Sequence, residues 1–413
     1  MKPSGPIPPG YEADAEGRLL IAGQDVSSLI EQAGDTPLFV YDHDMVAARV
    51  ARLRAAMPAG LEIHYAIKAN PFAPLVAMMA GIVDGFDVAS EGELARALQA
   101  GMAASRISFA GPGKRTRELE AAIRAGATLH LESEREAERA LDLGAALGIT
   151  PRLAVRVNPA FDLRGSGMRM GGGAKPFGID QERVAPLVRR IVEAGADYRG
   201  LHIFAGSQSL DADAIIETQA NTVALARRIE EESGTRAPLV NLGGGFGVPY
   251  FAGDAALDVE RIGQALAGEI GAEADRYAIE LGRWLVAEAG VYLTRVVDRK
   301  ESHGKIFLVT DGGMHHQLAA SGNFGTVVRR NYPVAVATRF GATPEEEASV
   351  VGCLCTPLDR LADDVGLPKA GEGDVIAVFL AGAYGASASP AAFLGHPPAA
   401  EMSVSAGNPP ALT

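Results

Sequence analysis

Apolar runs of strand length alternate with amphipathic stretches through the middle of the chain. The runs are rich in β-branched or other apolar residues, as buried strands are. They lie at 61–68, 85–89, 106–111, 128–133, 152–158, 198–206, 238–245 and 276–281. Between them are helical patterns such as EGELARALQAG and SEREAERALDLG, the second opening at Ser133, a typical helix start. Eight strands, each followed by a helix, predict an α/β fold with a parallel sheet closed into a (β/α)8 barrel.

The pattern changes after Trp284. Segments such as VYLTRVVDRK, KIFLVTDGG and GDVIAVFLAGAY are typical of strands joined by turns, with little helix between them. Near the N-terminus, YEADAEGRLLIAG and TPLFVYD predict a strand pair. We therefore expect an N-terminal segment at 1–42 that completes a β domain, a barrel at 43–284 and a C-terminal β domain at 285–413.

Charge and composition narrow the class of partner. The 413 residues include 51 acidic and 38 basic side chains, and the formal charge of −13 argues against nucleic acid or an anionic membrane surface. No secretory signal is visible, and no apolar run reaches the ~18 residues of a membrane span. Cys353 and Cys355, the two cysteines, are too close in sequence for an unstrained disulfide. We expect a cytoplasmic protein.

Polar and glycine residues stand at the ends of the predicted barrel strands, where the chemistry of such barrels is found. They are Lys68, Asp87, Arg156, His202, Gly243, Gly244, Gly245, Glu280, Gly282 and Arg283. Each alone has an ordinary explanation, such as a surface lysine, a turn glycine, a core histidine or a salt bridge between Arg156 and Asp87. Their joint occurrence calls for a cofactor with matching parts.

Pyridoxal phosphate (PLP) has those parts. It carries an aldehyde that condenses with an amine, a pyridine nitrogen that withdraws electrons when a carboxylate keeps it protonated, and a phosphate. Lys68 supplies the amine, Glu280 the carboxylate, and the glycines at 243–245 with Arg283 a phosphate site. The flat ring of His202 can cover one face of the pyridine. The pattern therefore predicts a PLP enzyme.

Motifs over roughly residues 35–390 resemble those of the fold type III PLP decarboxylases, the family of ornithine, arginine and diaminopimelate decarboxylases. The motifs are HYAIKAN, GFDVASEGEL with Asp87, HIFAGSQ with Ser207, NLGGGFG, ELGR, DGGM, GCLCTPLD and GAYG. The resemblance implies a TIM-type barrel like that of alanine racemase. It also implies that Lys68 is the Schiff-base residue, that His202 stacks on the ring and that Glu280 contacts its nitrogen.

The resemblance further implies a homodimer with shared active sites. In the family, the glycines, the Arg matched by Arg283 and a Tyr matched by Tyr384 bind phosphate. A Cys matched by Cys355 reaches into the partner subunit's site and protonates the quinonoid carbon. The implied reaction is α-decarboxylation of an L-amino acid or of a carrier-linked aminoacyl group.

Several positions depart from the family pattern. ELGR has Leu281 where Pro is usual, a change that leaves the flanking Glu and Arg in register. Diaminopimelate decarboxylases hold the distal end of their substrate with an Arg and a Tyr, matched here by Ala319 and Asn323, and Thr356 replaces their Glu. The segment HHQLAASGNFG is closer to the exosortase-associated and carrier-protein-linked glutamyl decarboxylases. We therefore expect poor activity on free diaminopimelate, ornithine and lysine, and better activity on an amino acid linked to a carrier protein or to CoA.

Candidate substrate contacts lie in the same segments and are His315, His316, Asn323, Thr356 and Asp359. We expect no metal at the histidine pair, since no carboxylate or third histidine lies at ligand spacing.

Three alternatives stay open. A diaminopimelate decarboxylase would need charge recognition from shifted positions such as His315, His316 or Arg329. An amino-acid racemase shares the barrel and the Lys but uses a Tyr as second base, and the motif around Cys355 argues against it. A non-catalytic binding protein is disfavoured because Lys68 and the other matched catalytic residues are intact.

Overall fold

The computed structural model describes residues 1–165, 167–322 and 329–412. The chain forms two compact units. The barrel unit contains Val50–Val248 and Ala256–Trp284, and the β unit contains Met1–Arg49, Pro249–Ala255 and Leu285–Thr413.

Eight parallel strands form the closed sheet of the barrel unit within the described residues. They are β5 (Glu62–Ala66), β6 (Gly85–Val88), β7 (Ile107–Phe109), β8 (Thr128–Leu131), β9 (Arg152–Asn158), β12 (Asp197–Ile203), β14 (Leu239–Asn241) and β15 (Tyr277–Leu281). The ring closes because β8 pairs with β9 and β15 pairs with β5, both in parallel. Short β11 (Ile179–Asp180) extends from β9, and β10 (Met168–Arg169) pairs with β13 (Gly206–Ser207). The predicted (β/α)8 barrel is confirmed.

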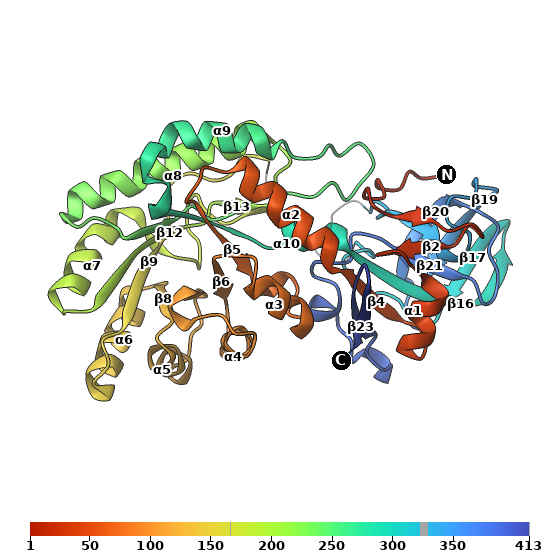
Figure 1. Ribbon diagram of the computed structural model, residues 1–413, viewed down its shortest axis with the longest axis horizontal. Coiled ribbons are helices and arrows are strands. Elements are labelled where there is room, and N and C mark those ends of the chain that lie inside the picture. Colours follow the sequence, from red (N-terminus) through yellow and green to blue (C-terminus); the bar gives the residue numbers. More distant parts are fainter. Residues whose placement is uncertain (166, 323–328, 413) are drawn as a thin grey trace. The chain divides into compact units, whose positions relative to one another are not determined.

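Helices cover the outside of this sheet (Figure 1). They are α3 (Ala73–Ala80), α4 (Glu91–Gln99), α5 (Thr116–Ala125), α6 (Glu134–Leu147), α7 (Gln181–Glu193), α8 (Ala212–Ser233) and α9 (Val259–Ile270), with α2 (His43–Ala56) before β5. Ser133 Oγ accepts the Glu136 N–H at 3.1 Å, which confirms the predicted start of α6. The last strand departs from the pattern, because β15 is followed only by the four-residue α10 (Arg283–Val286) before the chain continues into the β unit. No described helix is both long and apolar enough to cross a bilayer.

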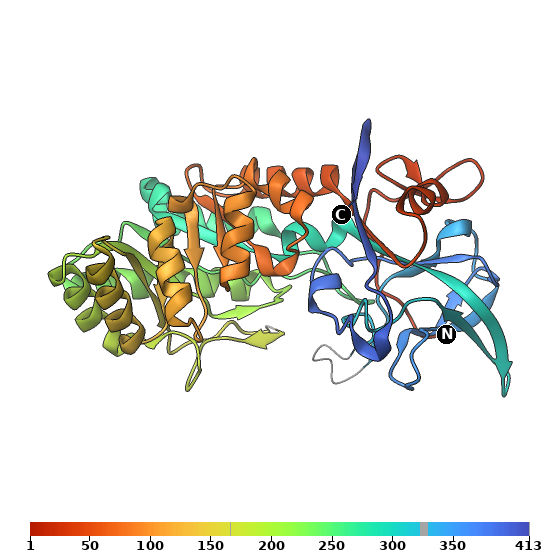
Figure 2. The same cartoon turned by 90° about the horizontal axis from the view of Figure 1, so that it is seen from below.

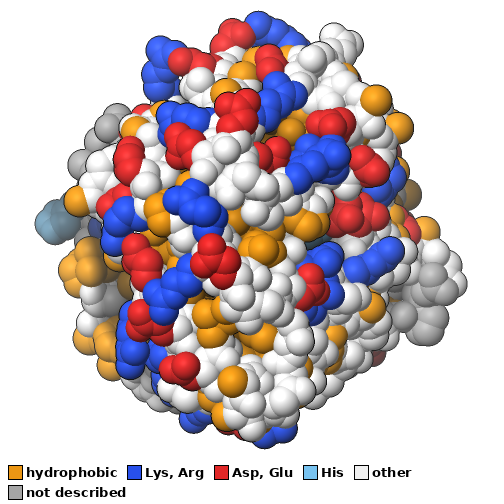
Figure 3. All heavy atoms as spheres, turned by 90° about the vertical axis from the view of Figure 1, so that its left-hand side faces the viewer, with side chains coloured by type: hydrophobic (Ala, Val, Ile, Leu, Met, Phe, Trp, Pro, Cys, Tyr) orange, Lys and Arg blue, Asp and Glu red, His pale blue; other side chains and the backbone are white. Residues whose placement is uncertain are grey.

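Charges of both signs are interspersed over the face in Figure 3, which is the end of the barrel unit where α6 and α7 lie in Figure 1. Exposed ion pairs join these two helices: Arg183 lies 2.8 Å from Glu134, and Arg190 lies 3.1 Å from Glu138. Such pairs add little stability in water. Neither sign of charge dominates this face.

The β unit takes strands from both ends of the chain, and both chain ends lie in it (Figure 2). Its main sheet has the order β20 (Arg360–Leu367), β19 (Glu346–Val351), β17 (Lys305–Thr310), β16 (Gly290–Ser302), β4 (Leu38–Asp42), β22 (Ala400–Ser405) and β23 (Asn408–Leu412). β21 (Val375–Val378) joins β16 to β18 (Val334–Val336). The N-terminal segment thus supplies an interior strand, since β4 pairs with β16 on one side and β22 on the other.

The two N-terminal segments expected to pair do not pair with each other. β1 (Glu12–Ala13), β2 (Leu19–Ile21) and β3 (Gln24–Asp25) fold on one another as a small separate sheet. β4 has no edge left for them, because β16 and β22 occupy both of its sides.

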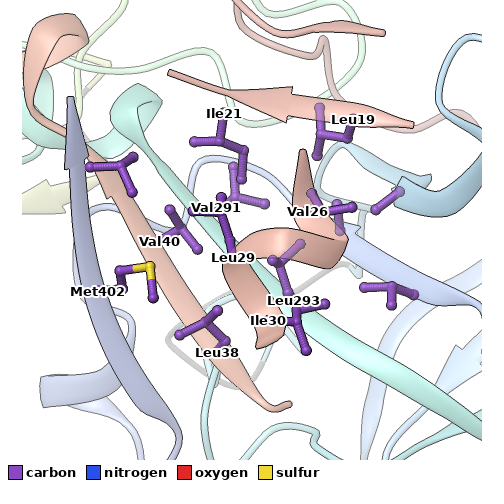
Figure 4. Packing of buried hydrophobic residues seen from close by; sticks show 14 of the residues in the cluster. Leu19, Ile21, Val26, Leu29, Ile30, Leu38, Val40, Val291, Leu293 and Met402 are labelled. Atoms are coloured by element: carbon purple, nitrogen blue, oxygen red, sulfur yellow. The ribbon is translucent and has the colours of Figure 1, made fainter. Parts of the chain in front are cut away.

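The core of the β unit lies between the main sheet, the small sheet and α1 (Val26–Ala33) (Figure 4). Alternate residues of the central strands point to this side, as the strand period of two requires. They include Leu38 and Val40 on β4 and Val291 and Leu293 on β16, all fully buried. These side chains hold the N-terminal and C-terminal parts of the chain together.

One loop of the barrel's sequence range belongs to the β unit. In Pro249–Ala255, the ring centroids of Tyr250 and Phe251 lie 4.9 Å and 5.6 Å from that of Tyr332. The Arg330 guanidinium lies 3.9 Å from the centroid of Phe251 and forms an ion pair with Asp254 at 3.6 Å. Aromatic packing, which strand and helix periodicity does not report, fixes this loop.

A matched pair of substitutions on β16 tests this core. Val291→Ala removes buried methyl groups and should lower the free energy of unfolding by about 2 kcal/mol. Val297→Ala, on the same strand but 51% exposed, should change it by no more than about 0.5 kcal/mol. Urea denaturation of both variants measures the difference, and equal losses would contradict the assignment of the core.

Candidate active site

Lys68 lies directly after β5, in the short 3-10 turn Ile67–Ala69. Its side chain is 45% exposed, and Nζ lies 3.9 Å from Asp87 Oδ2 on β6. Both residues line a cavity of about 320 Å³, together with Gly111, Arg156 and Phe177 among others. The amine is therefore accessible to a small molecule at the C-terminal end of the barrel strands.

Asp87 is a buried acid beside this amine. It is 2% exposed and accepts a hydrogen bond from Ser108 Oγ at 3.1 Å. Burial, together with the negative charge of Glu280, raises the pKa of Asp87 to about 6, against the opposing charge of Lys68. This carboxyl therefore changes its protonation close to neutral pH.

Glu280 on β15 is buried in a network that joins several strand ends. Its Oε2 accepts a hydrogen bond from Asn241 Nδ2 at 3.0 Å and lies 3.2 Å from His202 Nε2. The Nδ1 atoms of His202 and His130 are 2.9 Å apart. Burial pushes the pKa of Glu280 upward, but nearby positive charge, first that of His202 and then that of Lys68, holds it well below its ordinary value. Glu280 therefore stays ionised at neutral pH.

The glycines after β14 lie directly against Glu280. Gly243 and Gly245 have φ of +70° and +94°, and a Cβ on Gly244 would lie 2.1 Å from the Glu280 carbonyl oxygen. Side chains cannot be accommodated in this turn. Asn241 Oδ1 accepts the Gly243 N–H at 2.8 Å, so the same asparagine contacts both the glycine turn and the carboxylate.

Gly206, directly before Ser207, lies against this turn, since a Cβ on Gly245 would lie 3.0 Å from its carbonyl oxygen. Arg283 Nη2 lies 3.4 Å from Ser207 Oγ. A glycine-rich turn that a Cβ would block and an adjacent guanidinium are what a phosphate group requires. Together with the accessible Lys68 amine and the ionised Glu280, these residues fit PLP.

Glu132, His130 and Asn241 were not identified from the sequence. Arg156 Nη1 lies 2.7 Å from Glu132 Oε1, so Arg156 pairs with Glu132 and the alternative pair with Asp87 is not formed. Glu132 also accepts the N–H groups of two glycines in the loops beside it. Its position at the end of the predicted strand 128–133 was a usable signal.

The candidate residues of the β unit are not all accessible. Cys355 is exposed on the 352–359 loop, with Thr356 half-buried next to it. Asp359 is 3% exposed, and its carboxylate accepts the N–H of Met314 at 2.6 Å and of Leu354 at 2.8 Å. Asp359 therefore holds two segments together.

The histidine pair, which was also predicted to contact the substrate, is buried. His315 is 0% and His316 is 2% exposed. The ring nitrogens of His316 lie 3.1 Å from Tyr292 Oη and 2.9 Å from the Pro397 carbonyl oxygen. Both rings lie inside the β unit. Asn323 lies outside the described residues.

Tyr384, the predicted phosphate ligand of the β unit, has an unusual backbone. Its φ is +54°, in the left-handed region that a non-glycine residue adopts at a cost. Conformations of this kind concentrate at functional sites.

Several known proteins are similar to this chain in sequence and in fold. A family model described as "Pyridoxal-dependent decarboxylase, pyridoxal binding domain" matches residues 43–295. The chain is 38% identical over 379 residues to L-glutamyl-(BtrI acyl-carrier protein) decarboxylase of Niallia circulans, covering 89% of this chain and 88% of the relative. It is 32% identical to diaminopimelate decarboxylase of Methanothermobacter thermautotrophicus over 92% of this chain and 89% of the relative. The crystal structure of Helicobacter pylori diaminopimelate decarboxylase complexed with L-lysine superposes with a TM-score of 0.82, at 27% identity, covering 94% of this chain and 95% of that one.

The pKa of Asp87 leads to a pH-dependent stability in the cofactor-free protein. The folded state holds this proton more tightly than the unfolded chain, so wild type should lose stability relative to Asp87→Asn as the pH rises from 3.8 to about 6. The relative loss should be on the order of 2 kcal/mol. Urea denaturation of both proteins across this range measures it. A constant difference, or one of opposite sign, would contradict the assignment.

Proposed function

The chain belongs to the pyridoxal-dependent decarboxylases, and we propose that it decarboxylates an amino acid whose far end is joined through a neutral bond to an acyl carrier. The observation that carries this proposal is the charge around Thr356. In the described part of the β unit, the basic and imidazole groups considered for binding a second charged end are paired or buried.

Lys68 and Glu280 are proposed to hold the two reactive ends of the cofactor. When bound, PLP supplies a carbonyl that takes up an amine and a ring that withdraws electrons from the bond being broken. The accessible Lys68 amine holds the cofactor covalently. Glu280, kept ionised by its neighbours, keeps the ring nitrogen protonated. His202 lies between His130 and Glu280, which fixes its ring for contact with one face of the cofactor.

The remaining barrel residues are proposed to bind and orient. The N–H groups of the glycines at 243–245, with Ser207 and Arg283, bind the phosphate. Asp87 lies beside the Lys68 amine, and Arg156, fixed by Glu132, lines the same cavity. Gly282 leaves room for the strand end, since a Cβ there would lie 2.8 Å from Ala69 Cβ.

Cys355 is proposed to donate a proton to the carbon that has lost CO2, in the active site of the other subunit of a homodimer. Tyr384 of the same unit is proposed to contact the phosphate. The exposure of Cys355 supports this role.

Charge around the Cys355 loop supports a neutral substrate end. The family's acid after the catalytic Cys is Thr356 here, and its Arg is Ala319. Arg329 and Arg360 both pair with Asp363, at 3.4 Å and 2.7 Å, and Arg329 also donates to the Arg360 carbonyl oxygen. Burying a free charged substrate end without a partner is costly, whereas a thioester or amide requires none.

The relative from Niallia circulans supports the same substrate class, since it acts on an L-glutamyl group carried by an acyl carrier protein. Diaminopimelate decarboxylase is the second candidate, supported by the relative from Methanothermobacter thermautotrophicus at lower identity. The two candidates differ in whether the distal end is charged and free.

The substrate class is tested by CO2 release from matched compounds. The panel is an L-glutamyl group on a purified acyl carrier protein through its side-chain carboxyl, the same group as a pantetheine thioester, free L-glutamate and free meso-diaminopimelate. We expect kcat/KM for the carrier thioester to exceed that for either free amino acid by about 100-fold or more. The rate of CO2 release by the Lys68→Ala variant gives the background. A kcat/KM of ~10⁴ M⁻¹s⁻¹ or above on free meso-diaminopimelate would replace this proposal with the diaminopimelate one.

Shared active sites are tested by mixing inactive chains. Lys68→Ala and Cys355→Ala should each be nearly inactive, and co-expressed they should regain about a quarter of wild-type activity, because random pairing leaves one intact site in each heterodimer. The matched control co-expresses Lys68→Ala with the double variant Lys68→Ala/Cys355→Ala, which should restore nothing. If subunits exchange and the first mixture stays inactive, Cys355 does not act across a dimer.

A further inference from the structure

His315, Cys353 and His396 converge inside the β unit, although they come from three distant segments of the chain. One possible ligand atom from each lies within 4.8 Å of the other two. Cys353 Sγ lies 3.9 Å from Nδ1 and 3.8 Å from Nε2 of His396, and the ring centroids of His315 and His396 are 5.2 Å apart. Local sequence spacing argued against a metal at the histidine pair, but it cannot detect ligands that the fold brings together.

His315 is the second, independent sign of a ligand. It is 0% exposed, and neither ring nitrogen has a hydrogen-bond partner, a state shared by no other buried histidine in the described residues. The neighbouring His316 is buried as deeply, yet both of its nitrogens are engaged. Buried polar groups are almost always hydrogen-bonded, and an exception calls for an explanation such as an ion.

Asp359 holds the ligand-bearing segments in register. Its carboxylate accepts the N–H of Met314, next to His315, and the N–H of Leu354, next to Cys353. Gly313 and Gly352 make room for it, because a Cβ on either would lie 2.2 Å from an Asp359 carboxylate oxygen.

The third ligand segment is anchored separately. His316 Nε2 donates a hydrogen bond to the Pro397 carbonyl oxygen at 2.9 Å, and its Nδ1 lies 3.1 Å from Tyr292 Oη. The bond to Pro397 fixes the residue directly after His396. The position of all three ligands is therefore set by groups that are not themselves ligands, as is common around metal sites.

The donor set selects the kind of ion. One thiolate and two imidazoles suit zinc, whereas Mg²⁺ and Ca²⁺ take oxygen ligands. Tetrahedral zinc with bonds of about 2.0–2.3 Å places its ligand atoms about 3.4–3.6 Å apart. The Cys353–His396 separations of 3.8 Å and 3.9 Å are close to these values, and the ligand atom of His315 lies within 4.8 Å of the other two.

We propose that His315, Cys353 and His396 form a three-ligand site for Zn²⁺ or a similar divalent transition metal. The site leaves a fourth coordination position for water or another ligand. It is independent of the proposed decarboxylation, and it lies at the base of the loop that carries Cys355.

Selective alkylation of the two cysteines tests the site in the wild-type holoenzyme. Iodoacetamide labelling of each cysteine is measured by mass spectrometry after incubation with Zn²⁺, with Mg²⁺ or with EDTA. Zn²⁺ should slow labelling of Cys353 by about tenfold or more, because a metal-bound thiolate is a poor nucleophile. Cys355 is not one of the three ligands, so its labelling rate should not depend on the metal and serves as the internal control. Equal labelling of Cys353 with Zn²⁺ and EDTA would overturn the proposal.

Metal content of matched variants gives a second measurement. Gel-filtered holoenzyme loaded with Zn²⁺ should retain one zinc per chain by mass spectrometry, and X-ray absorption should show one sulfur ligand. His315→Asn, His396→Gln and Cys353→Ser should each lose this zinc, while Cys355→Ser keeps it. Retention of zinc in Cys353→Ser would overturn the proposal. If a variant fails to bind PLP or to fold, the labelling of the wild type decides alone.

Discussion

A carboxylate buried at the end of a barrel strand is the constraint on which the active site depends. Glu280 is 4% exposed, and removing such a group from water costs several kcal/mol unless partners replace the lost hydration. Asn241 and His202 are those partners, and His130 and the Gly243 amide hold them in turn. These contacts link the ends of β8, β12, β14 and β15 to the Glu280 carboxylate. Because the members satisfy one another, changing any of them leaves another buried polar group without its bond.

Much of this site could be predicted because a closed parallel barrel gathers the carboxyl ends of its strands. The runs at 61–68 and 276–281 place Lys68 and Glu280 on the same rim whatever the details of packing. Partners chosen by tertiary contact could not be predicted in the same way. Glu132 rather than Asp87 pairs with Arg156, and the burial of His315 depends on segments far from it in the chain. The periodicity of strands and helices also did not predict that Pro249–Ala255 belongs to the β unit, where aromatic rings hold this loop.

The residues proposed to hold the cofactor and those proposed to choose the substrate lie mostly in different parts of the molecule. The barrel carries most of the first group. The β unit carries Thr356 and Ala319, at positions where diaminopimelate decarboxylases have charged side chains. Arg329 and Arg360 of the same unit both form ion pairs with Asp363. One fold can thus keep its chemistry while changing what it accepts, since function resides in the site rather than the fold.

The position of β4 has a consequence for how the protein is made. A ribosome releases the whole barrel range, Val50–Trp284, before it reaches either neighbour of β4, which are β16 and β22. The apolar strand Leu38–Asp42 must therefore wait, unpaired, through most of synthesis. Long-range pairings of this kind form slowly, and unpaired strand edges promote aggregation. Nascent chains that stall before residue 400 would lack β22 and leave one edge of β4 unpaired.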